Sequence, residues 1–173
     1  MILLFPSYPT NINNPDPAFD FEVKNAKQLG FTVGFVSIEL MLGGDVILKI
    51  PQTTDSKVMY RGWILKEEQY ISLYKALLER NLELINSPEQ YNLSQLLPLW
   101  YPHLKDNTPE SAWIPGNTFS KSSIEETISI FKDSPIIIKD YMKSRKQDWF
   151  DACYIDSASN LDEVHRVPNN FLN

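Results

Sequence analysis

The first half of the chain alternates short apolar runs with segments of helical periodicity, a pattern typical of parallel strands joined by crossover helices. Five short apolar runs read as strands: residues 1–5, 31–38, 45–50, 58–60 and 82–85. Between them, Tyr70, Leu73 and Leu77 recur at spacings of three and four, which predicts a helix over residues 65–80. The pattern therefore predicts an α/β fold with a parallel sheet.

Prolines and turn-forming residues punctuate this pattern. Residues 6–17 contain four prolines, which predict a loop between the first strand and the first helix. Loops at that place lie over ligand sites in open α/β sheets. The helix after it is expected to begin with Asp16 as N-cap and Pro17 in its first turn, and to end at Gly30. Ser87 followed by Pro88 predicts another helix start.

The second half changes character at four prolines, Pro98, Pro102, Pro109 and Pro115. Their density predicts a junction between domains. We therefore expect a first domain over residues 1–97, a Pro-rich junction over 98–118 and a second region over 119–173. In the second half, strands are expected at 111–114, 135–142 and 152–155, and a helix at 122–132.

Charge and cysteine content exclude several classes of protein. The 16 lysines and arginines against 22 aspartates and glutamates give a net charge of −6, which argues against a generic nucleic-acid binder. The single cysteine, Cys153, cannot form an internal disulfide. No apolar run is long enough to span a bilayer, and the N-terminus does not have the pattern of a signal peptide. We therefore expect a cytoplasmic protein without membrane or nucleic-acid partners.

A basic segment at residues 139–146 stands out in this acidic chain. Four cations, Lys139, Lys143, Arg145 and Lys146, fall within eight residues and follow a strongly β-prone run, with Lys139 expected still inside the strand. One interpretation is a clamp for a polyphosphate, with Ser144 as a neutral donor, because lysine and arginine supply point charges and bidentate forks. The alternative is a solvated basic turn after an edge strand.

A second candidate is Arg61-Gly62-Trp63, at the carboxyl end of a predicted strand. Ligands bind at that end of the strands in α/β sheets, and a glycine lets the backbone approach closely. The alternative is a structural turn in which Arg61 stacks on Trp63.

Other chemistry-bearing residues give weak signals. His103 and His165 lie 62 residues apart without a cysteine or carboxylate at ligand spacing, so a zinc site is not expected. Cys153 lies in a β-prone run and is expected to be a buried packing residue. The sequence contains no P-loop, no dinucleotide-binding glycine fingerprint and no nucleophile-elbow motif.

Four strings, taken in order, resemble a little-characterised ATP-grasp clade of bacteria and their phages. The strings are Tyr60-Arg61-Gly62-Trp63, Asn86-Ser87-Pro88-Glu89-Gln90-Tyr91, Leu99-Trp100-Tyr101-Pro102 and Lys139-Asp140-Tyr141-Met142-Lys143-Ser144-Arg145-Lys146. The resemblance covers about residues 1–155. It implies a Rossmann-like pre-ATP-grasp domain followed by the beginning of an ATP-grasp lid subdomain.

The resemblance also implies a reaction. ATP-grasp enzymes typically transfer the γ-phosphoryl group of ATP to a carboxylate, and an amine or thiol then captures the acyl phosphate. Lys139 matches the strand lysine that contacts ATP phosphates in that fold. Residues 143–146 (Lys143, Ser144, Arg145 and Lys146) stand where the family has a glycine-rich loop, so side chains replace backbone amides there. Arg61, with Tyr60, is the candidate for binding the carboxylate of a small molecule or peptide.

The chain departs from the family in its last part. The adenine-binding hinge strand and the acidic residues that hold Mg²⁺ are expected in a C-terminal part beyond Asn173, so ATP and Mg²⁺ are implied but the chain is expected to be inactive alone. A separate C-terminal half or a homo-oligomer are the expected protein partners. The alternative function is a non-catalytic ligand-binding or protein-binding module derived from an ATP-grasp protein.

Overall fold

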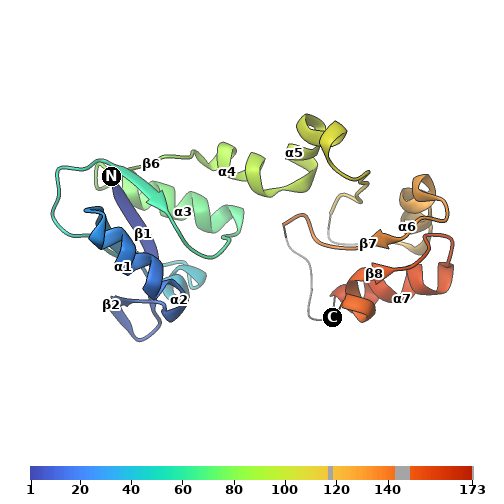
Figure 1. Cartoon of the computed structure of the whole chain (residues 1–173), viewed down its shortest axis with the longest axis horizontal. Helices are drawn as coiled ribbons and strands as arrows, with labels where there is room; N and C mark the ends of the chain where they lie inside the picture. The colour runs from blue at the N-terminus through green and yellow to red at the C-terminus, as the bar shows by residue number, and fades with distance from the viewer. Residues whose placement is uncertain (117–118, 143–148, 173) are drawn as a thin grey trace. The chain divides into compact units, whose positions relative to one another are not determined.

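The computed structural model describes residues 1–116, 119–142 and 149–172. The chain divides into two compact units, Met1–Asn92 and Leu93–Asn173 (Figure 1). Each unit has its own hydrophobic core, and each is described separately below.

The first unit is a mixed α/β unit built on a mostly parallel sheet. Its strands are β1 (Ile2–Tyr8), β2 (Asn11–Pro15), β3 (Thr32–Val36), β4 (Leu48–Lys49), β5 (Lys57–Tyr60) and β6 (Glu83–Leu84). They lie in the order β4-β3-β1-β5-β6, with β2 paired to the end of β1. The pairs β1/β3, β1/β5 and β5/β6 are parallel, whereas β3/β4 and β1/β2 are antiparallel. The predicted α/β class is therefore confirmed.

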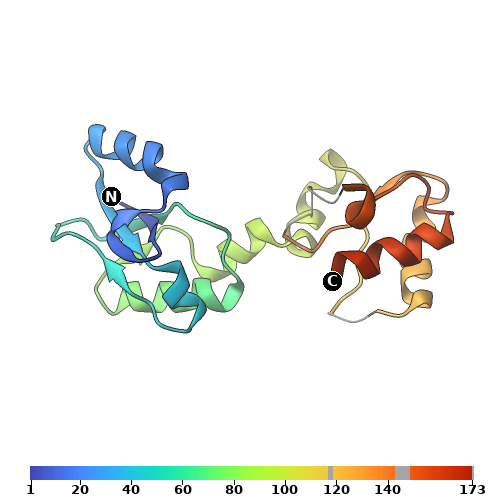
Figure 2. The ribbon, with the colours of Figure 1, turned by 90° about the horizontal axis from the view of Figure 1, so that it is seen from below.

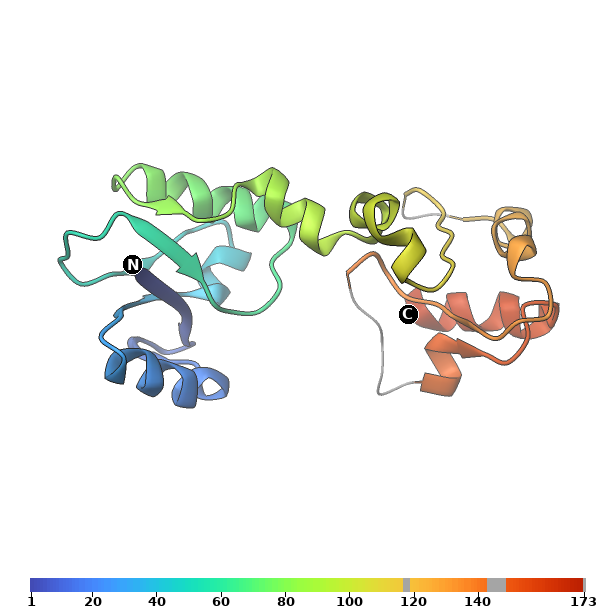
Figure 3. The ribbon, with the colours of Figure 1, turned by 45° about the horizontal axis from the view of Figure 1, so that its top comes forward.

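Helices cover both faces of this sheet. The helices are α1 (Asp20–Gln28), α2 (Ile38–Leu42), α3 (Glu67–Leu78) and α4 (Pro88–Gln95). Figures 2 and 3 show the strands between α1 and α3. Side chains of the central strand β1 alternate between these two faces. Ile2 and Leu4 belong to one hydrophobic cluster, and Leu3 and Phe5 belong to another.

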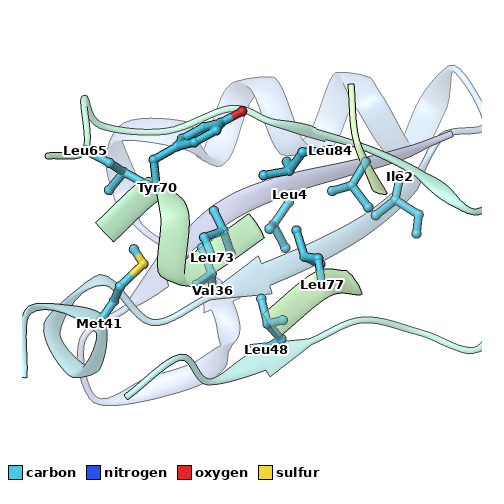
Figure 4. Close-up of a cluster of buried hydrophobic side chains, with 11 residues drawn as sticks. Ile2, Leu4, Val36, Met41, Leu48, Leu65, Tyr70, Leu73, Leu77 and Leu84 are labelled. Atoms are coloured by element: carbon cyan, nitrogen blue, oxygen red, sulfur yellow. The ribbon is translucent and has the colours of Figure 1, made fainter. Parts of the chain in front are cut away.

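The larger cluster lies between the sheet and α3 (Figure 4). Tyr70, Leu73 and Leu77 of α3 are all buried, which confirms the helical face predicted from their spacing. The ring of Tyr70 stacks on Tyr91 of α4 at 3.8 Å between centroids. The other cluster lies under α1 and contains Phe5, Val23, Ala26, Val33 and Phe35.

The predicted helix signals before α1 are confirmed. Asp16 Oδ1 accepts a 2.9 Å hydrogen bond from the Ala18 amide, and Pro17 opens a 3₁₀ turn, η1 (Pro17–Phe19), that leads into α1. Gly30 follows the helix with a φ of 81°, in the left-handed region that favours glycine.

The predicted loop over residues 6–17 is wrong in part. β1 continues to Tyr8, and β2 turns back against it, pairing Ser7 with Pro15 and Tyr8 with Asn11. The prolines are tolerated because Pro15 ends its short strand and Pro6 contributes its carbonyl, which accepts a 2.9 Å hydrogen bond from the Asp16 amide. The short helix α2 was not predicted either; it occupies Ile38–Leu42 after the N-cap Ser37.

The second unit is smaller and mainly helical. It contains α5 (Leu97–Leu104), η2 (Lys105–Asn107), α6 (Lys121–Ile128), η3 (Ser129–Phe131), β7 (Ile136–Ile137), a π-helical segment η5 (Trp149–Cys153), β8 (Tyr154–Ile155) and α7 (Leu161–Leu172). β7 and β8 pair antiparallel. The core of this unit consists of Ile124, Ile136, Ile155, Ala158, Val164 and Val167.

Several expectations for this half are wrong. The predicted Pro-rich junction begins with a helix, because Pro98 falls in the first turn of α5, where its missing N–H costs nothing. Residues 111–114 do not form a strand. The strand expected over 135–142 is only Ile136–Ile137, and the one expected over 152–155 is only Tyr154–Ile155.

The amino terminus is held by an ion pair at the end of the sheet where the central strand β1 begins. The Met1 ammonium lies 2.7 Å from Asp55 Oδ1, and the Thr32 hydroxyl donates a 3.0 Å hydrogen bond to Asp55 Oδ2. Hydrogen bonds from the terminal ammonium and from Thr32 lower the pKa of the Asp55 carboxyl. Among the described residues, no helix is both long enough and apolar enough to cross a membrane.

Candidate functional site

The first unit has one place where the direction of the chain through the sheet reverses. From β1 the chain adds β3 and β4 on one side, and then returns to place β5 and β6 on the other. The carboxyl ends of β1 and β5 therefore lie at a topological switch point, and ligands bind at such points in open α/β sheets. Residues 60–63, the end of β5 and the turn after it, lie at this point.

The backbone of this turn is held closely against β1. The Arg61 amide donates a 2.8 Å hydrogen bond to the Leu4 carbonyl, and the Tyr60 hydroxyl donates one of 2.9 Å to the Trp63 carbonyl. A Cβ atom on Gly62 would lie 2.5 Å from Tyr60 Cζ and 2.8 Å from Pro6 Cγ. Only glycine therefore fits between the Tyr60 ring and Pro6, as the close-approach interpretation of Gly62 predicts.

The Arg61 side chain is paired with a carboxylate from α1. Its Nε and Nη2 atoms lie 2.7 and 2.6 Å from the same oxygen, Glu22 Oε1. The structural alternative had Arg61 stacked on Trp63, whereas the structure gives it Glu22 as its partner. This contact leaves Nη1 without a partner among the described residues, and the Arg61 side chain is 50% exposed.

The Trp63 side chain contacts the segment that leads into α1. Its Nε1 donates a 3.1 Å hydrogen bond to Asp16 Oδ2, and its ring meets Phe19 edge to face at 5.2 Å between centroids. Half of the indole remains exposed, at 51%. The last residue of β5, two residues after it and three residues around the start of α1 form one group, which we call the switch-point cluster: Asp16, Phe19, Glu22, Tyr60, Arg61 and Trp63.

Electrostatics limit which ligands suit this place. Asp16, Asp20 and Glu22 lie at or near the amino end of α1, where a phosphate would otherwise be favoured by the helix dipole. The helix end is thus already supplied with negative charge. Burial raises the pKa of the Tyr60 hydroxyl well above its usual range, so this group remains a neutral hydrogen-bond donor.

Two further features lie beside the cluster. The Ser7 hydroxyl, at the end of β1, is buried and has no hydrogen-bond partner among the described residues. The next residue, Tyr8, borders a surface depression of about 390 Å³, which is also lined by Asn14, Pro15, Pro17 and Asp20. Neither feature was predicted from the sequence, because both depend on the unexpected β1/β2 hairpin.

The basic segment is only partly described. Lys143, Ser144, Arg145 and Lys146 lie outside the described residues. Lys139 is exposed and lies two residues beyond β7, so the expectation that it remains inside the strand is wrong. Because Lys139 is exposed, its charge needs no bound anion to compensate for burial.

The backbone around Lys139 is nevertheless anchored. The Ile138 amide donates a 2.7 Å hydrogen bond to the Cys153 carbonyl. The Tyr141 hydroxyl donates one of 2.8 Å to the Ile114 carbonyl, and the Tyr141 carbonyl accepts one of 3.0 Å from the Leu97 amide. Lys139 is therefore displayed from a segment that is fixed on both sides.

The remaining candidates have structural surroundings. Cys153 is fully buried, as predicted for a packing residue. His165 Nε2 lies 2.8 Å from Glu125 Oε1 and joins α7 to α6. Within the described ranges, no group of three or more histidine, cysteine, aspartate or glutamate side chains could hold a metal ion.

No protein-family model matches the chain, and no curated protein matches it significantly. Sequence reasoning identified Arg61, Tyr60 and Trp63, but it missed Glu22 and Asp16 as their partners. These residues are separated by 39 and 47 positions, and no local pattern signals such pairs.

Proposed function

We propose that the chain is the N-terminal part of an ATP-grasp-type, ATP-dependent carboxylate ligase, with its first unit as a Rossmann-like pre-ATP-grasp domain. The strand order β4-β3-β1-β5-β6 supports this proposal, because it matches the order 3-2-1-4-5 of dinucleotide-binding sheets, with the difference that β4, in the place of strand 3, runs antiparallel to β3. The acidic amino end of α1 argues against a dinucleotide at the switch point itself. The switch point is therefore assigned to the second substrate.

The observation that carries the assignment is the position of Arg61. A guanidinium held at the switch point, with one edge open, can bind a carboxylate bidentately. Tyr60 shapes the turn through its hydrogen bond to the Trp63 carbonyl and stays neutral. In this proposal Arg61 binds and orients the carboxylate that is to be activated.

ATP supplies the phosphoryl group that converts this carboxylate into an acyl phosphate, which an amine or thiol then captures. The role of this chain toward ATP is charge neutralisation, since phosphoryl transfer depends mainly on positioning and electrostatics. Lys139 and the cations at 143, 145 and 146 are proposed to contact the phosphates, with Ser144 as a neutral donor. Mg²⁺ ligands are assigned to a C-terminal part, supplied by a second polypeptide or a longer chain.

The test is calorimetric titration of the chain with ATP and Mg²⁺. We expect weak, saturable binding that falls tenfold or more, on the order of 1.4 kcal/mol, in the double variant Lys139→Ala, Arg145→Ala. The matched control is Lys105→Ala, Lys121→Ala, which removes two exposed lysines of the same unit and should bind like the wild type.

Absence of ATP binding by the wild-type chain would contradict the proposal. Equal binding by the wild type and both double variants would remove the basic segment from the site. Carboxylate binding at Arg61 without any ATP binding would instead support the non-catalytic binding module.

A further inference from the structure

The ion pair between Arg61 and Glu22 is asymmetric. Both guanidinium contacts, from Nε at 2.7 Å and from Nη2 at 2.6 Å, end on one oxygen, Glu22 Oε1. A carboxylate that saturates a guanidinium edge normally uses both of its oxygens. Glu22 therefore fixes the Nε side of Arg61 and leaves the terminal Nη1 side available.

A second contact fixes the Trp63 side chain beside this guanidinium. Trp63 packs on Phe19, and Arg61 pairs with Glu22, so the two side chains meet positions 19 and 22. Positions three apart on a helical segment lie on the same face, one turn from each other. The indole and the guanidinium are thus held side by side against the start of α1, and each remains about half exposed, at 51% and 50%.

We propose that Glu22 is a positioning residue, which holds Arg61 so that its Nη1/Nη2 edge receives a ligand with a single carboxylate, next to the open indole of Trp63. This inference rests on the proposed function and names the substrate class of the same site. Holding a flexible arginine in its binding geometry reduces the entropy lost when the ligand arrives.

The preference for a single negative charge follows from the surroundings. Three carboxylates, from Asp16, Asp20 and Glu22, accompany one guanidinium at this place, and two of them already accept hydrogen bonds from Trp63 and Arg61. These carboxylates repel a second anionic group on the ligand, and the switch-point cluster contains no second cation that could pair with it. A monocarboxylate, such as the C-terminus of a peptide, fits better than a dicarboxylate or a phosphate.

The competing explanation is that Glu22 merely occupies Arg61 and competes with the ligand. The two explanations predict opposite effects of Glu22→Gln. If Glu22 positions Arg61, its neutralisation weakens carboxylate binding; if Glu22 competes, its neutralisation strengthens binding. Asp20→Asn is the matched control. Asp20 lies two residues before Glu22 and carries the same charge, but its side chain does not pair with Arg61.

The experiment is an NMR titration of the full chain with N-acetylglycine, observed at the Arg61 Nε–H and Trp63 Nε1–H signals. We expect saturable shifts in the wild type, an affinity about fivefold weaker in Glu22→Gln, and an unchanged or slightly higher affinity in Asp20→Asn. N-acetylaspartate and inorganic phosphate are expected to bind more weakly than N-acetylglycine.

A charge-swapped variant separates positioning from stability. Glu22→Arg combined with Arg61→Glu can restore an ion pair and the melting temperature, but it places the guanidinium on α1. We expect this variant to fold like the wild type and to lose N-acetylglycine binding. Full binding by the swapped variant would overturn the proposal.

The remaining outcomes separate this inference from the proposed function. Equal or tighter N-acetylglycine binding in Glu22→Gln overturns the positioning role alone. Equal affinity for phosphate or N-acetylaspartate overturns the preference for one carboxylate. Absence of saturable shifts in the wild type overturns this inference together with the carboxylate site, whereas ATP binding through Lys139 is measured independently.

Discussion

Ser7 and Ser37 directly follow Pro6 and Val36, which are paired on the neighbouring parallel strands β1 and β3, but their hydroxyls differ. Both side chains are buried, at 2% and 3% exposure. Ser37 Oγ accepts a hydrogen bond from the Leu40 amide and caps α2, whereas Ser7 Oγ has no partner among the described residues.

This difference predicts opposite effects of the same substitution. Ser7→Ala removes a buried hydroxyl that gains nothing from folding, so we expect the free energy of unfolding to rise by about 1 kcal/mol. Ser37→Ala, the matched control, removes a helix cap and should lower it by about 1 kcal/mol. Urea denaturation of both variants measures the two shifts, and a loss of stability in Ser7→Ala would show that its hydroxyl is satisfied in solution.

A side chain at residue 62 is expected to displace the switch-point cluster. In Gly62→Ala the new Cβ meets Tyr60 Cζ at 2.5 Å and Pro6 Cγ at 2.8 Å, so the unfolding free energy should fall by about 1–3 kcal/mol. The nearest atom to a Cβ at Gly43 lies at 3.3 Å, and Gly43→Ala is the control, with a loss of less than about 1 kcal/mol. Trp63 fluorescence should change in Gly62→Ala and remain as in the wild type in Gly43→Ala.

Two leucines of α3 differ only in the face of the helix that they occupy. Leu73 is fully buried and Leu78 is 46% exposed. Truncation of Leu73 to alanine leaves a cavity and should cost about 2–5 kcal/mol, whereas Leu78→Ala should cost about 0.5 kcal/mol. Chemical denaturation followed by far-UV circular dichroism compares them, and similar losses would contradict the assigned core of the first unit.

Alkaline pH should destabilise the first unit through Tyr70. Burial raises the pKa of Tyr70 from 10.0 to about 12. The folded-state pKa is above the unfolded value, so the folded state favours the neutral Tyr70 hydroxyl. The contribution of this hydroxyl to the free energy of unfolding is complete below pH 10 and is lost as the pH rises through 12. Melting temperatures measured between these values should fall less steeply in Tyr70→Phe, although that variant also loses the 3.0 Å hydrogen bond to the Asn86 carbonyl. Equal slopes in both proteins would remove Tyr70 as the source.

The parts of the fold that the sequence predicts correctly are those encoded by local signals. The cap formed by Asp16 and Pro17 and the buried face of α3 each arise within one element. A strand was predicted where β4 lies, but its antiparallel direction and the β1/β2 hairpin were missed because strand pairing depends on tertiary context. The helix α5 was missed because Pro98 was interpreted as part of a Pro-rich junction, although it stands in the first turn of that helix.

The candidate site shows the same limit. Arg61 could be identified because it follows a predicted strand and precedes Gly62, but its partner Glu22 lies 39 residues earlier on a helix whose face toward β5 has no signature in the sequence. The basic run suggested a buried lysine at 139, yet β7 ends two residues earlier and Lys139 lies in solvent. Burial at a strand end depends on how far pairing with β8 extends, which composition does not reveal.

The two ends of the sheet order also bear on how the protein behaves at high concentration. β4 and β6, the outermost strands of that order, are each two residues long, and each carries an exposed charged side chain, Lys49 and Glu83. Short, charged edges offer few unpaired backbone groups to another molecule and discourage edge-to-edge association. The first unit is thereby protected at both margins against aggregation through added strands, even though its central strands are strongly apolar.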